Sequence, residues 1–251
     1  TMVEDGGYGS RAIASIGKII WWDYDGPSGF NRTNLSPNVE GSRMTAFPAE
    51  NLVGQCWNKK LLYQAGQIIG MDGQNFGISG IYAPCINLHR EIINGRNYEC
   101  YSEDPVLSGY LAANFSLGAK SNGVYVYLKH LALYDSSPYT SQRVWCTEQN
   151  FRENYMKPFE IAVKKGGATG AMASFNKIGA TWAGSNQAMI DGIMRTEWGF
   201  KGTIVTDYDD GGDSNMKLRA GIRGGLNLQL NPLYGEAKTN GRLDTSDITD
   251  M

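Results

Sequence analysis

Five polar residues that could do chemistry stand at or just after apolar, strand-like runs of the sequence. Asp207 is the strongest candidate, because a lone carboxylate at the end of a buried strand is available for nucleophilic or acid–base chemistry. Lys129 and His130 end another such run and offer two hydrogen-bond donors. Asp25 closes a third run, and Arg96 lies in a loop whose carboxylates could hold it ready for sugar hydroxyls or an anion.

Each of these residues also has a simpler structural explanation. An aspartate after a strand most often caps the next helix, which would account for Asp207. Asp25 precedes Gly-Pro and would suit an Asx turn. The charges of residues 89–105 could form a solvated salt-bridge loop that adds little stability. Local sequence alone does not decide between these explanations and a functional site.

The elements that would position these residues can be predicted from hydrophobic periodicity. The predicted strands are residues 18–22, 78–88, 124–128, 168–175, 203–206 and 226–230, and the predicted helices are residues 58–76, 108–122, 147–165, 187–198 and 216–222. Pro84 lies inside the second of these strands, so we expect that strand to break early. Strands that alternate with helices predict an α/β fold, here a TIM-like (β/α) barrel that can be irregular or incomplete at its ends. Because ligands bind at the carboxyl ends of such strands, we expect the candidate residues to share one rim.

Composition limits the classes of partner. The chain has 251 residues, 41% hydrophobic and 19% charged, enough for one barrel domain over residues 1–251. A net charge of −2 and no basic cluster exclude a nucleic-acid surface, and no apolar run of about 18 residues predicts a membrane span. Both ends of the sequence are typical of a segment of a longer protein. The sequence does not indicate whether the protein is cytoplasmic or secreted.

The cysteines and histidines argue against a metal site. Cys56, Cys85, Cys100 and Cys146 lie at wide spacings without Cys-x-x-Cys pairs, and we expect them to be buried thiols. The two histidines are too few for a histidine-rich metal site. We therefore expect no Cys-x-x-Cys zinc site and no histidine-rich metal site.

Taken in order, the polar segments resemble a known family. They are Asp25-Gly26-Pro27, Gly95-Arg96-Asn97 through Tyr101-Ser102-Glu103-Asp104-Pro105, Lys129-His130, Met172-Ala173-Ser174-Phe175-Asn176, Glu197-Trp198-Gly199-Phe200 and Val205-Thr206-Asp207. This ordered set resembles the barrel domain of glycoside hydrolase family 3, whose best-known members are β-glucosidases. It looks closest to large bacterial members in which the barrel follows the second α/β domain instead of preceding it.

The resemblance implies a role for each matching position. Asp207 would be the nucleophile of a retaining exo-β-glycosidase, forming a covalent glycosyl-enzyme. The substrate-binding positions would be Asp25, Arg96, Lys129, His130, Met172, Phe175 and Tyr208. The implied partners are a β-linked glucoside or oligosaccharide and a second α/β domain. The resemblance implies neither a metal nor an organic cofactor, since hydrolysis of this type needs only carboxylates. We expect the cations of Arg96 and Lys129 to lower the pKa of Asp207 and hold it charged.

The sequence also departs from the family pattern. Retaining hydrolysis needs a proton donor. In β-glucosidase-like members this is a Glu on the second domain, which this chain does not contain, so the acid/base would come from outside it. One branch of the family takes the donor from a His soon after the Lys-His pair, but residues 131–135 contain no histidine. Phe175 stands where Tyr is common and Tyr208 where Trp is common, and residues 134–139 also depart from the pattern, which leaves the sugar open.

Three functions are therefore compared. The first is the glycosidase domain described above. The second is a catalytically weakened, carbohydrate-binding barrel that keeps the pocket. The third is an unrelated barrel enzyme, such as an aldolase that uses Lys129 as a Schiff base. The third ranks last, because it leaves Asp25, Arg96 and Asp207 unexplained.

Overall fold

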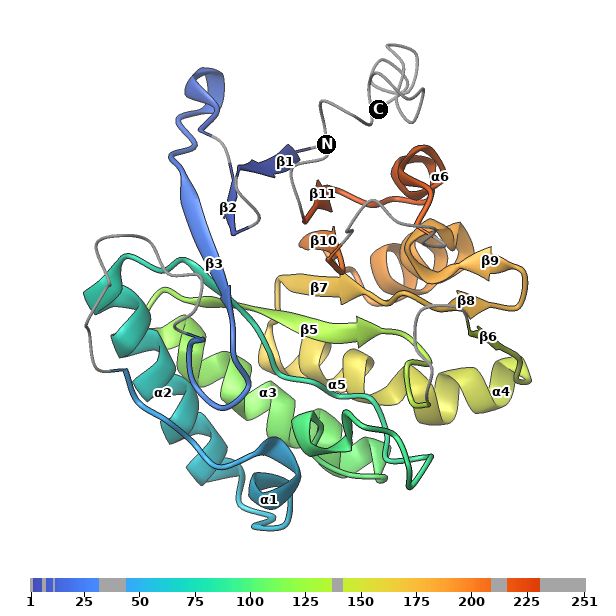
Figure 1. Ribbon diagram of the computed structural model, residues 1–251, viewed down its shortest axis with the longest axis horizontal. Helices are drawn as coiled ribbons and strands as arrows, with labels where there is room; N and C mark the ends of the chain where they lie inside the picture. Colours follow the sequence, from blue (N-terminus) through green and yellow to red (C-terminus); the bar gives the residue numbers. More distant parts are fainter. Residues whose placement is uncertain are drawn as a thin grey trace.

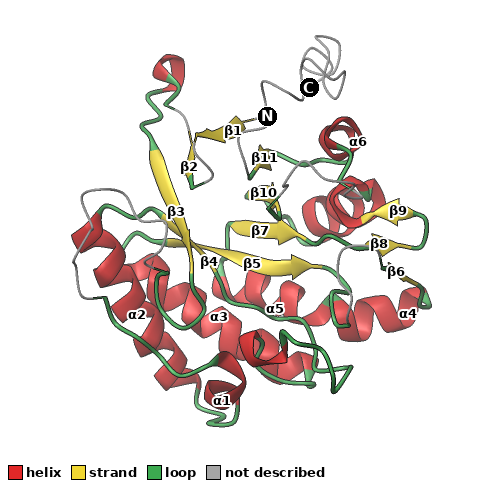
Figure 2. Cartoon of the chain, viewed as in Figure 1, coloured by secondary structure: helices red, strands yellow, loops and turns green. Residues whose placement is uncertain are grey.

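The structure is a computed structural model, and it describes residues 2–5, 8–10, 12–31, 44–136, 142–208 and 216–230. Within these residues the strands form a closed barrel in the order β1-β11-β10-β7-β5-β4-β3-β2 (Figures 1 and 2). Their bounds are β1 Met2–Asp5, β2 Gly9–Ser10, β3 Trp21–Asp25, β4 Gly80–Tyr82, β5 Tyr125–Leu131, β7 Gly170–Ala173, β10 Thr203–Thr206 and β11 Leu228–Gln229. The predicted TIM-like barrel is thus confirmed.

The irregular part of the barrel lies at the amino-terminal strands. From β3 through β4, β5, β7, β10 and β11 to β1, every pairing is parallel. The short β2 is antiparallel to both of its neighbours, β1 and β3. A parallel pair needs a long crossover, whereas an antiparallel pair needs only a tight turn, so the barrel closes here over a short stretch of chain.

Helices cover the outside of the barrel. They are α1 Glu50–Gly54, α2 Lys59–Phe76, α3 Pro105–Ser121, α4 Glu148–Asn150, α5 Lys157–Gly166 and α6 Leu218–Arg223, with π-helical segments η4 Phe151–Tyr155 and η6 Ala188–Glu197 and short 3-10 turns η1 Ala14–Ile16, η3 Asn97–Glu99 and η5 Ala183–Ser185. The remaining strands, β6 Arg143–Val144, β8 Lys177–Ile178 and β9 Thr181–Trp182, form a small separate sheet. Figure 1 shows α2, α3 and α5 along one side of the barrel.

The helices begin and end where local chemistry favours it. The Asn58 side chain accepts a hydrogen bond from the Leu61 N–H at the start of α2, and α2 ends at Gly77 with a φ of 68°. Asp104 caps α3 in the same way. Two glycines bring α2 and α3 together, because a Cβ on Gly66 would lie 2.2 Å from the Phe115 carbonyl oxygen. In the same way, a Cβ on Gly118 of α3 would lie 2.1 Å from the Tyr63 carbonyl oxygen of α2.

Alternate residues of each strand point into the barrel. A cluster of Tyr82, Tyr127, Met172, Val205, Leu228 and Leu230 fills the interior, whereas neighbours such as Ile81, Leu128 and Ile204 belong to the core under the helices. This period of two matches the geometry of β-strands. It also places residues two positions apart on one strand in successive interior layers.

Some boundaries differ from the predictions. The strand predicted at residues 18–22 is β3, which starts at Trp21. Ile13 and Lys18 pair across a short turn before it and leave Ile19 70% exposed. The run at 78–88 breaks early, as predicted: β4 spans only Gly80–Tyr82, and beyond Pro84 the pairing continues as isolated bridges at Cys85. The helix predicted at 147–165 contains the π-helical segment η4 between α4 and α5. Strands β1 and β2 were not predicted.

The prediction of four buried thiols is wrong. Cys85 and Cys100 form a disulfide, and Cys56 and Cys146 are exposed free thiols. The wide sequence spacing hid the pair, because the chain leaves β4, loops outward and returns beside its own starting point. The departures at residues 137–139 and the glycine-rich loop after Tyr208 lie outside the described residues.

Candidate active site

The carboxyl ends of the parallel strands form the rim where the candidate residues meet. Asp25 ends β3, Lys129 and His130 lie in the last part of β5, and Asp207 follows β10 directly. Arg96 reaches this rim from the loop after β4 and precedes the short turn η3. Both Arg96 and Lys129 act electrostatically on Asp207, as does the charge of Asp25. Residues separated by up to 182 positions in sequence (25 to 207) therefore share one site.

Asp207 has one oxygen that is held by a hydrogen bond and one that is not. Its side chain is buried, with the residue 9% exposed, and Oδ1 accepts a hydrogen bond of 2.8 Å from the Tyr208 N–H. Oδ2 accepts no hydrogen bond from any residue that the structure describes. The imidazole of His130 lies close to it, with Nε2 3.6 Å from Oδ2, which is too far for a hydrogen bond. An oxygen that is buried but has no hydrogen-bond donor retains its lone pairs for a ligand.

The pKa of Asp207 differs from the prediction. Burial raises it from the ordinary 3.8 to about 6, although Arg96 and Lys129 act in the opposite direction. The prediction of a lowered pKa is wrong, because it counted the two cations and omitted the loss of hydration. With a pKa of about 6, the carboxylate is still mostly ionised at neutral pH.

A buried glutamate links the two cations of the rim. Glu99 accepts two hydrogen bonds from Arg96, at 2.7 Å from Nε and 2.8 Å from Nη2, and its Oε2 lies 3.5 Å from Lys129 Nζ. Burial disfavours both charges, but the pairing outweighs it, so the pKa of Glu99 is lowered and that of Arg96 is raised. The bidentate contact fixes the plane of the guanidinium.

His130 is neutral and is held by Asn87. Burial, and then the charges of Arg96 and Lys129, lower the pKa of His130 well below its ordinary value. Its contact with Asp207 is therefore not an ion pair. The backbone N–H of His130 donates to Asn87 Oδ1 at 2.7 Å, and Asn87 Nδ2 donates to the His130 carbonyl at 2.8 Å.

Aromatic residues surround the rim. The Arg96 guanidinium lies 5.6 Å from the centre of the Tyr134 ring, which also lies 4.7 Å from the His130 ring and 6.1 Å from Phe175. Tyr8 donates a hydrogen bond of 2.9 Å to Asp25 Oδ2. Of the other predicted contacts, Tyr208 is 48% exposed and Met172 is buried in the barrel interior.

Comparison with known proteins identifies the family. Residues 36–231, more than half of the chain, match the model of the glycosyl hydrolase family 3 N terminal domain. The chain belongs to glycosyl hydrolase family 3. This family membership leaves the aldolase hypothesis without support, and the ion pair between Lys129 and Glu99 gives that hypothesis no help.

Relatives in the family are β-glucosidases. The chain is 34% identical over 199 residues to a beta-glucosidase of Rhizobium radiobacter, which covers 79% of this chain and 24% of that protein. It is 32% identical over 221 residues to beta-glucosidase A of Butyrivibrio fibrisolvens, with 88% and 26% covered. The chain therefore spans about a quarter of these relatives.

Solved structures share the fold. Beta-glucosidase 3B of Thermotoga neapolitana in complex with alpha-D-glucose has a TM-score of 0.84 and 28% identity, covering 98% of this chain and 36% of that chain. A Kluyveromyces marxianus beta-glucosidase in complex with glucose has a TM-score of 0.85 at 23% identity, covering 99% of this chain and 30% of that one, which supports the fold alone.

Sequence reasoning missed several residues of this family 3 rim. Glu99 lies in the loop whose carboxylates are expected to hold an arginine, and Tyr134 lies in the segment that departs from the family pattern, but the sequence singles out neither residue. Asn87 and Tyr8 gave no signal. Glu99 could have been found, because a glutamate three residues after an arginine in a helical turn can reach it.

Two further observations concern other ligands. Among the described residues, no group of His, Cys, Asp and Glu could hold a metal ion, and no described helix has the length and apolar character needed to cross a membrane. A cavity of about 610 Å³ lies at the opposite, amino end of the barrel, lined by residues that include Trp21, Tyr125 and Trp198. It is separate from the rim that contains Asp207.

Proposed function

We propose that this chain is the catalytic barrel of a retaining, exo-acting β-glycosidase of the β-glucosidase type, with Asp207 as the nucleophile. The observation that carries the proposal is Asp207 Oδ2, a buried oxygen without a hydrogen bond from the described residues, on a rim that also holds Arg96 and Lys129. Family membership and the names of the relatives support the reaction class.

The proposed chemistry has two steps. A lone pair of the ionised Asp207 forms a bond to the anomeric carbon, the glycosidic bond breaks, and the leaving oxygen takes a proton from an acid. Water, deprotonated by the same group, then displaces Asp207 and gives overall retention. Because the carboxylate must be ionised to attack, its pKa of about 6 sets the acidic limb of the rate profile.

The rest of the rim would hold the sugar ring. Arg96, fixed by Glu99, and Lys129 provide charged donors for hydroxyl groups, while Asp25 provides an acceptor. Neutral His130 can add a hydrogen bond without neutralising the nucleophile. Phe175 and exposed Tyr208 provide apolar faces for the sugar, whereas buried Met172 supports the floor of the pocket.

The acid/base would come from outside this chain. This part of the proposal rests on the relatives, which are about four times longer than the segment that they share with the chain. We propose a second α/β domain of the same or another polypeptide as the source, in an order that places the barrel after it. The proposed substrate is a terminal β-linked glucoside or oligosaccharide, in line with the glucose in a related structure.

Covalent labelling tests the proposal. The full-length protein is treated with an activated 2-fluoro glycoside, which slows the second step and leaves the sugar on the nucleophile. Peptide mass spectrometry should find the label on Asp207. A label on another carboxylate would refute the assignment.

The same experiment tests the alternative, a catalytically weakened carbohydrate-binding barrel. Measurable affinity of the full-length protein for glucosides, with neither label nor hydrolysis, would support that alternative.

A further inference from the structure

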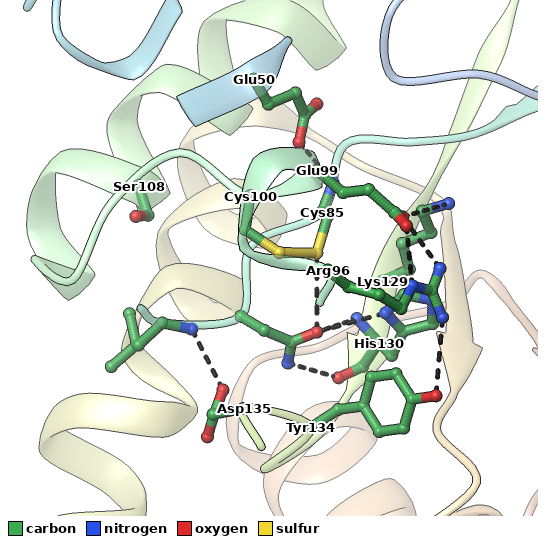
Figure 3. Close-up of a disulfide and its surroundings, with 12 residues drawn as sticks. Glu50, Cys85, Arg96, Glu99, Cys100, Ser108, Lys129, His130, Tyr134 and Asp135 are labelled. Carbon is green, nitrogen blue, oxygen red and sulfur yellow. Dashed lines mark hydrogen bonds and ion pairs between the residues drawn. A yellow bond between two sulfur atoms is a disulfide. The ribbon is translucent and has the colours of Figure 1, made fainter. Parts of the chain in front are cut away.

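We propose that the Cys85–Cys100 disulfide positions the sugar-binding side of the rim, by closing the loop that carries Asn87, Arg96 and Glu99. The inference rests on the proposed function, since it assigns the disulfide to the same site. Figure 3 shows the sulfur bridge next to Glu99, with Arg96 and Lys129 grouped beside it.

The disulfide joins the two ends of one loop. Cys85 lies just past β4, Cys100 lies 15 positions later, and residues 86–99 project between them. Cys85 pairs in parallel with both Cys100 and Lys129. The backbone around it is also tied to β5, because the Ile86 N–H donates to the Lys129 carbonyl at 2.8 Å. Both ends of the loop are thereby fixed against the strand that carries Lys129 and His130.

The residues next to the two cysteines hold the rim. Glu99, directly before Cys100, pairs with Arg96 and Lys129. Asn87, two positions after Cys85, holds the backbone of His130. A change in the separation of the loop ends would therefore move partners of three proposed sugar-binding residues together. A displacement of about 1 Å in such a site can lower a rate on the order of 100-fold.

The disulfide is protected, which fits a fixed structural role. Cys85 is 1% exposed and Cys100 is 6% exposed, so a thiolate in solution has little access to either sulfur. Buried Glu50 accepts a hydrogen bond from the Cys85 N–H at 3.0 Å and adds a further anchor. The free thiols of Cys56 and Cys146 are exposed and provide a natural control.

The test compares two double variants of the full-length protein. In Cys85→Ala/Cys100→Ala, kcat/KM for an aryl β-glucoside should fall on the order of 10- to 100-fold, with a rise in KM. The acidic limb of its pH profile should shift upward, because Arg96 and Lys129 hold the pKa of Asp207 down. Cys56→Ser/Cys146→Ser should keep the wild-type kinetics and profile.

Hydrogen exchange provides a readout that does not depend on activity. Amides of residues 86–99 should exchange faster in Cys85→Ala/Cys100→Ala, while those of α3 and α5 keep their wild-type rates. Unchanged kinetics, pH profile and exchange would overturn the inference. If wild-type Asp207 is not labelled but exchange of residues 86–99 still rises, the proposed function fails and the disulfide keeps its role in ordering the loop.

A second measurement tests the inference if Cys85→Ala/Cys100→Ala does not fold. Because the folded protein shields the disulfide, the Cys56→Ser/Cys146→Ser protein is unfolded in urea, reduced with a dithiol and refolded. The dithiol becomes a cyclic disulfide as Cys85 and Cys100 take up two electrons and two protons. Molecules shown by mass to have gained two hydrogens should display the same upward shift of the acidic limb. A profile identical to that of the oxidised protein would refute the inference.

Discussion

Asp207 and Asp23 lie at opposite ends of the barrel interior and have the same pKa for the same reason. Burial raises each of them to about 6. Their hydrogen bonds differ. Asp23 accepts from the hydroxyl groups of Tyr125 and Tyr127, one on each oxygen. Asp207 Oδ2 accepts none from the described residues. A raised pKa therefore marks a buried carboxylate and does not separate these two residues, whereas the oxygen without a donor does. Buried Asp135 also has an oxygen without a donor, so the proposal for Asp207 needs its place on the rim as well.

The surrounding charges differ in the same way. Asp207 faces Arg96 and Lys129, which are paired with Glu99 and still act on it. The cation that acts on Asp23 is Lys18, whose Nζ donates to Ser10 Oγ at 2.8 Å. Both oxygens of Asp23 thus have a hydroxyl donor, whereas Oδ2 of Asp207 has none among the described residues.

The largest expected effect separates the two aspartates by activity. Asp207→Asn should lower kcat of the full-length protein on the order of 10⁴-fold or more, because the amide cannot act as the nucleophile. Asp23→Asn should keep kcat within about tenfold. Steady-state kinetics with an aryl β-glucoside measure both. Equal losses of kcat in the two variants would show that Asp207 is no more important for activity than Asp23.

The pH dependence of stability should be shared by the two residues. Because each folded pKa is raised from 3.8 to about 6, the folded state retains a proton that the unfolded state has lost. This stabilisation is complete below pH 3.8 and is lost as the pH rises through 6. Relative to wild type, Asp207→Asn should therefore gain about 2.4 kcal/mol in free energy of unfolding between pH 4 and pH 7.5.

The comparison becomes sharper with Asp23→Asn. Its free energy of unfolding relative to wild type should rise by the same amount from pH 4 to pH 7.5. At both pH values it should be lower than that of Asp207→Asn, because one tyrosine hydroxyl then faces an amide N–H group. Urea unfolding at both pH values gives the two numbers. If the free energy of unfolding of either variant, relative to wild type, is the same at both pH values, the pKa of the replaced aspartate is not raised.

Glu99→Gln should have the next largest effect. The variant loses the charge that fixes Arg96 and lies 3.5 Å from Lys129 Nζ, so kcat/KM should fall about 10- to 100-fold. Glu103→Gln, in an exposed position of the same segment, is the matched control and should match wild type. Similar losses in both variants would point to a general effect of charge on substrate encounter.

The smallest expected effect lies at the amino end of the barrel. Tyr127→Phe removes the donor to Asp23 Oδ2 and should lower the free energy of unfolding by about 1–2 kcal/mol at pH 7.5, with kcat unchanged. Tyr110→Phe, on the outside of α3, controls for the loss of a hydroxyl group. A large loss of kcat in Tyr127→Phe would mean that the two ends of the barrel are coupled.

Much of the fold could be predicted because its signals are local. The β-branched run at residues 203–206 became β10, and the apolar period of residues 58–76 gave α2. Strands β1 and β2 could not be predicted in this way, because each is too short for a period of two to be recognised. Their pairing depends on the closure of the barrel.

The site was predictable in its members and less so in its energetics. Asp25, Arg96, Lys129, His130 and Asp207 do share one rim, as the strand ends predicted, while their roles remain proposals. The direction of the Asp207 pKa shift depends on how deeply the fold buries it, which no sequence pattern contains. The disulfide was missed because the contact arises only when the loop returns to β4.

The alternation of strand residues also sets how far a ligand can enter. Asp23 and Asp25 face the interior two positions apart on β3, which is about 7 Å along the strand. The layer of Tyr82, Tyr127 and Met172 occupies the space between the rim and the tyrosine-bound aspartate. A polysaccharide has no route through this plug. In the proposed glycosidase, this plug would limit entry to the outermost sugar unit of a substrate.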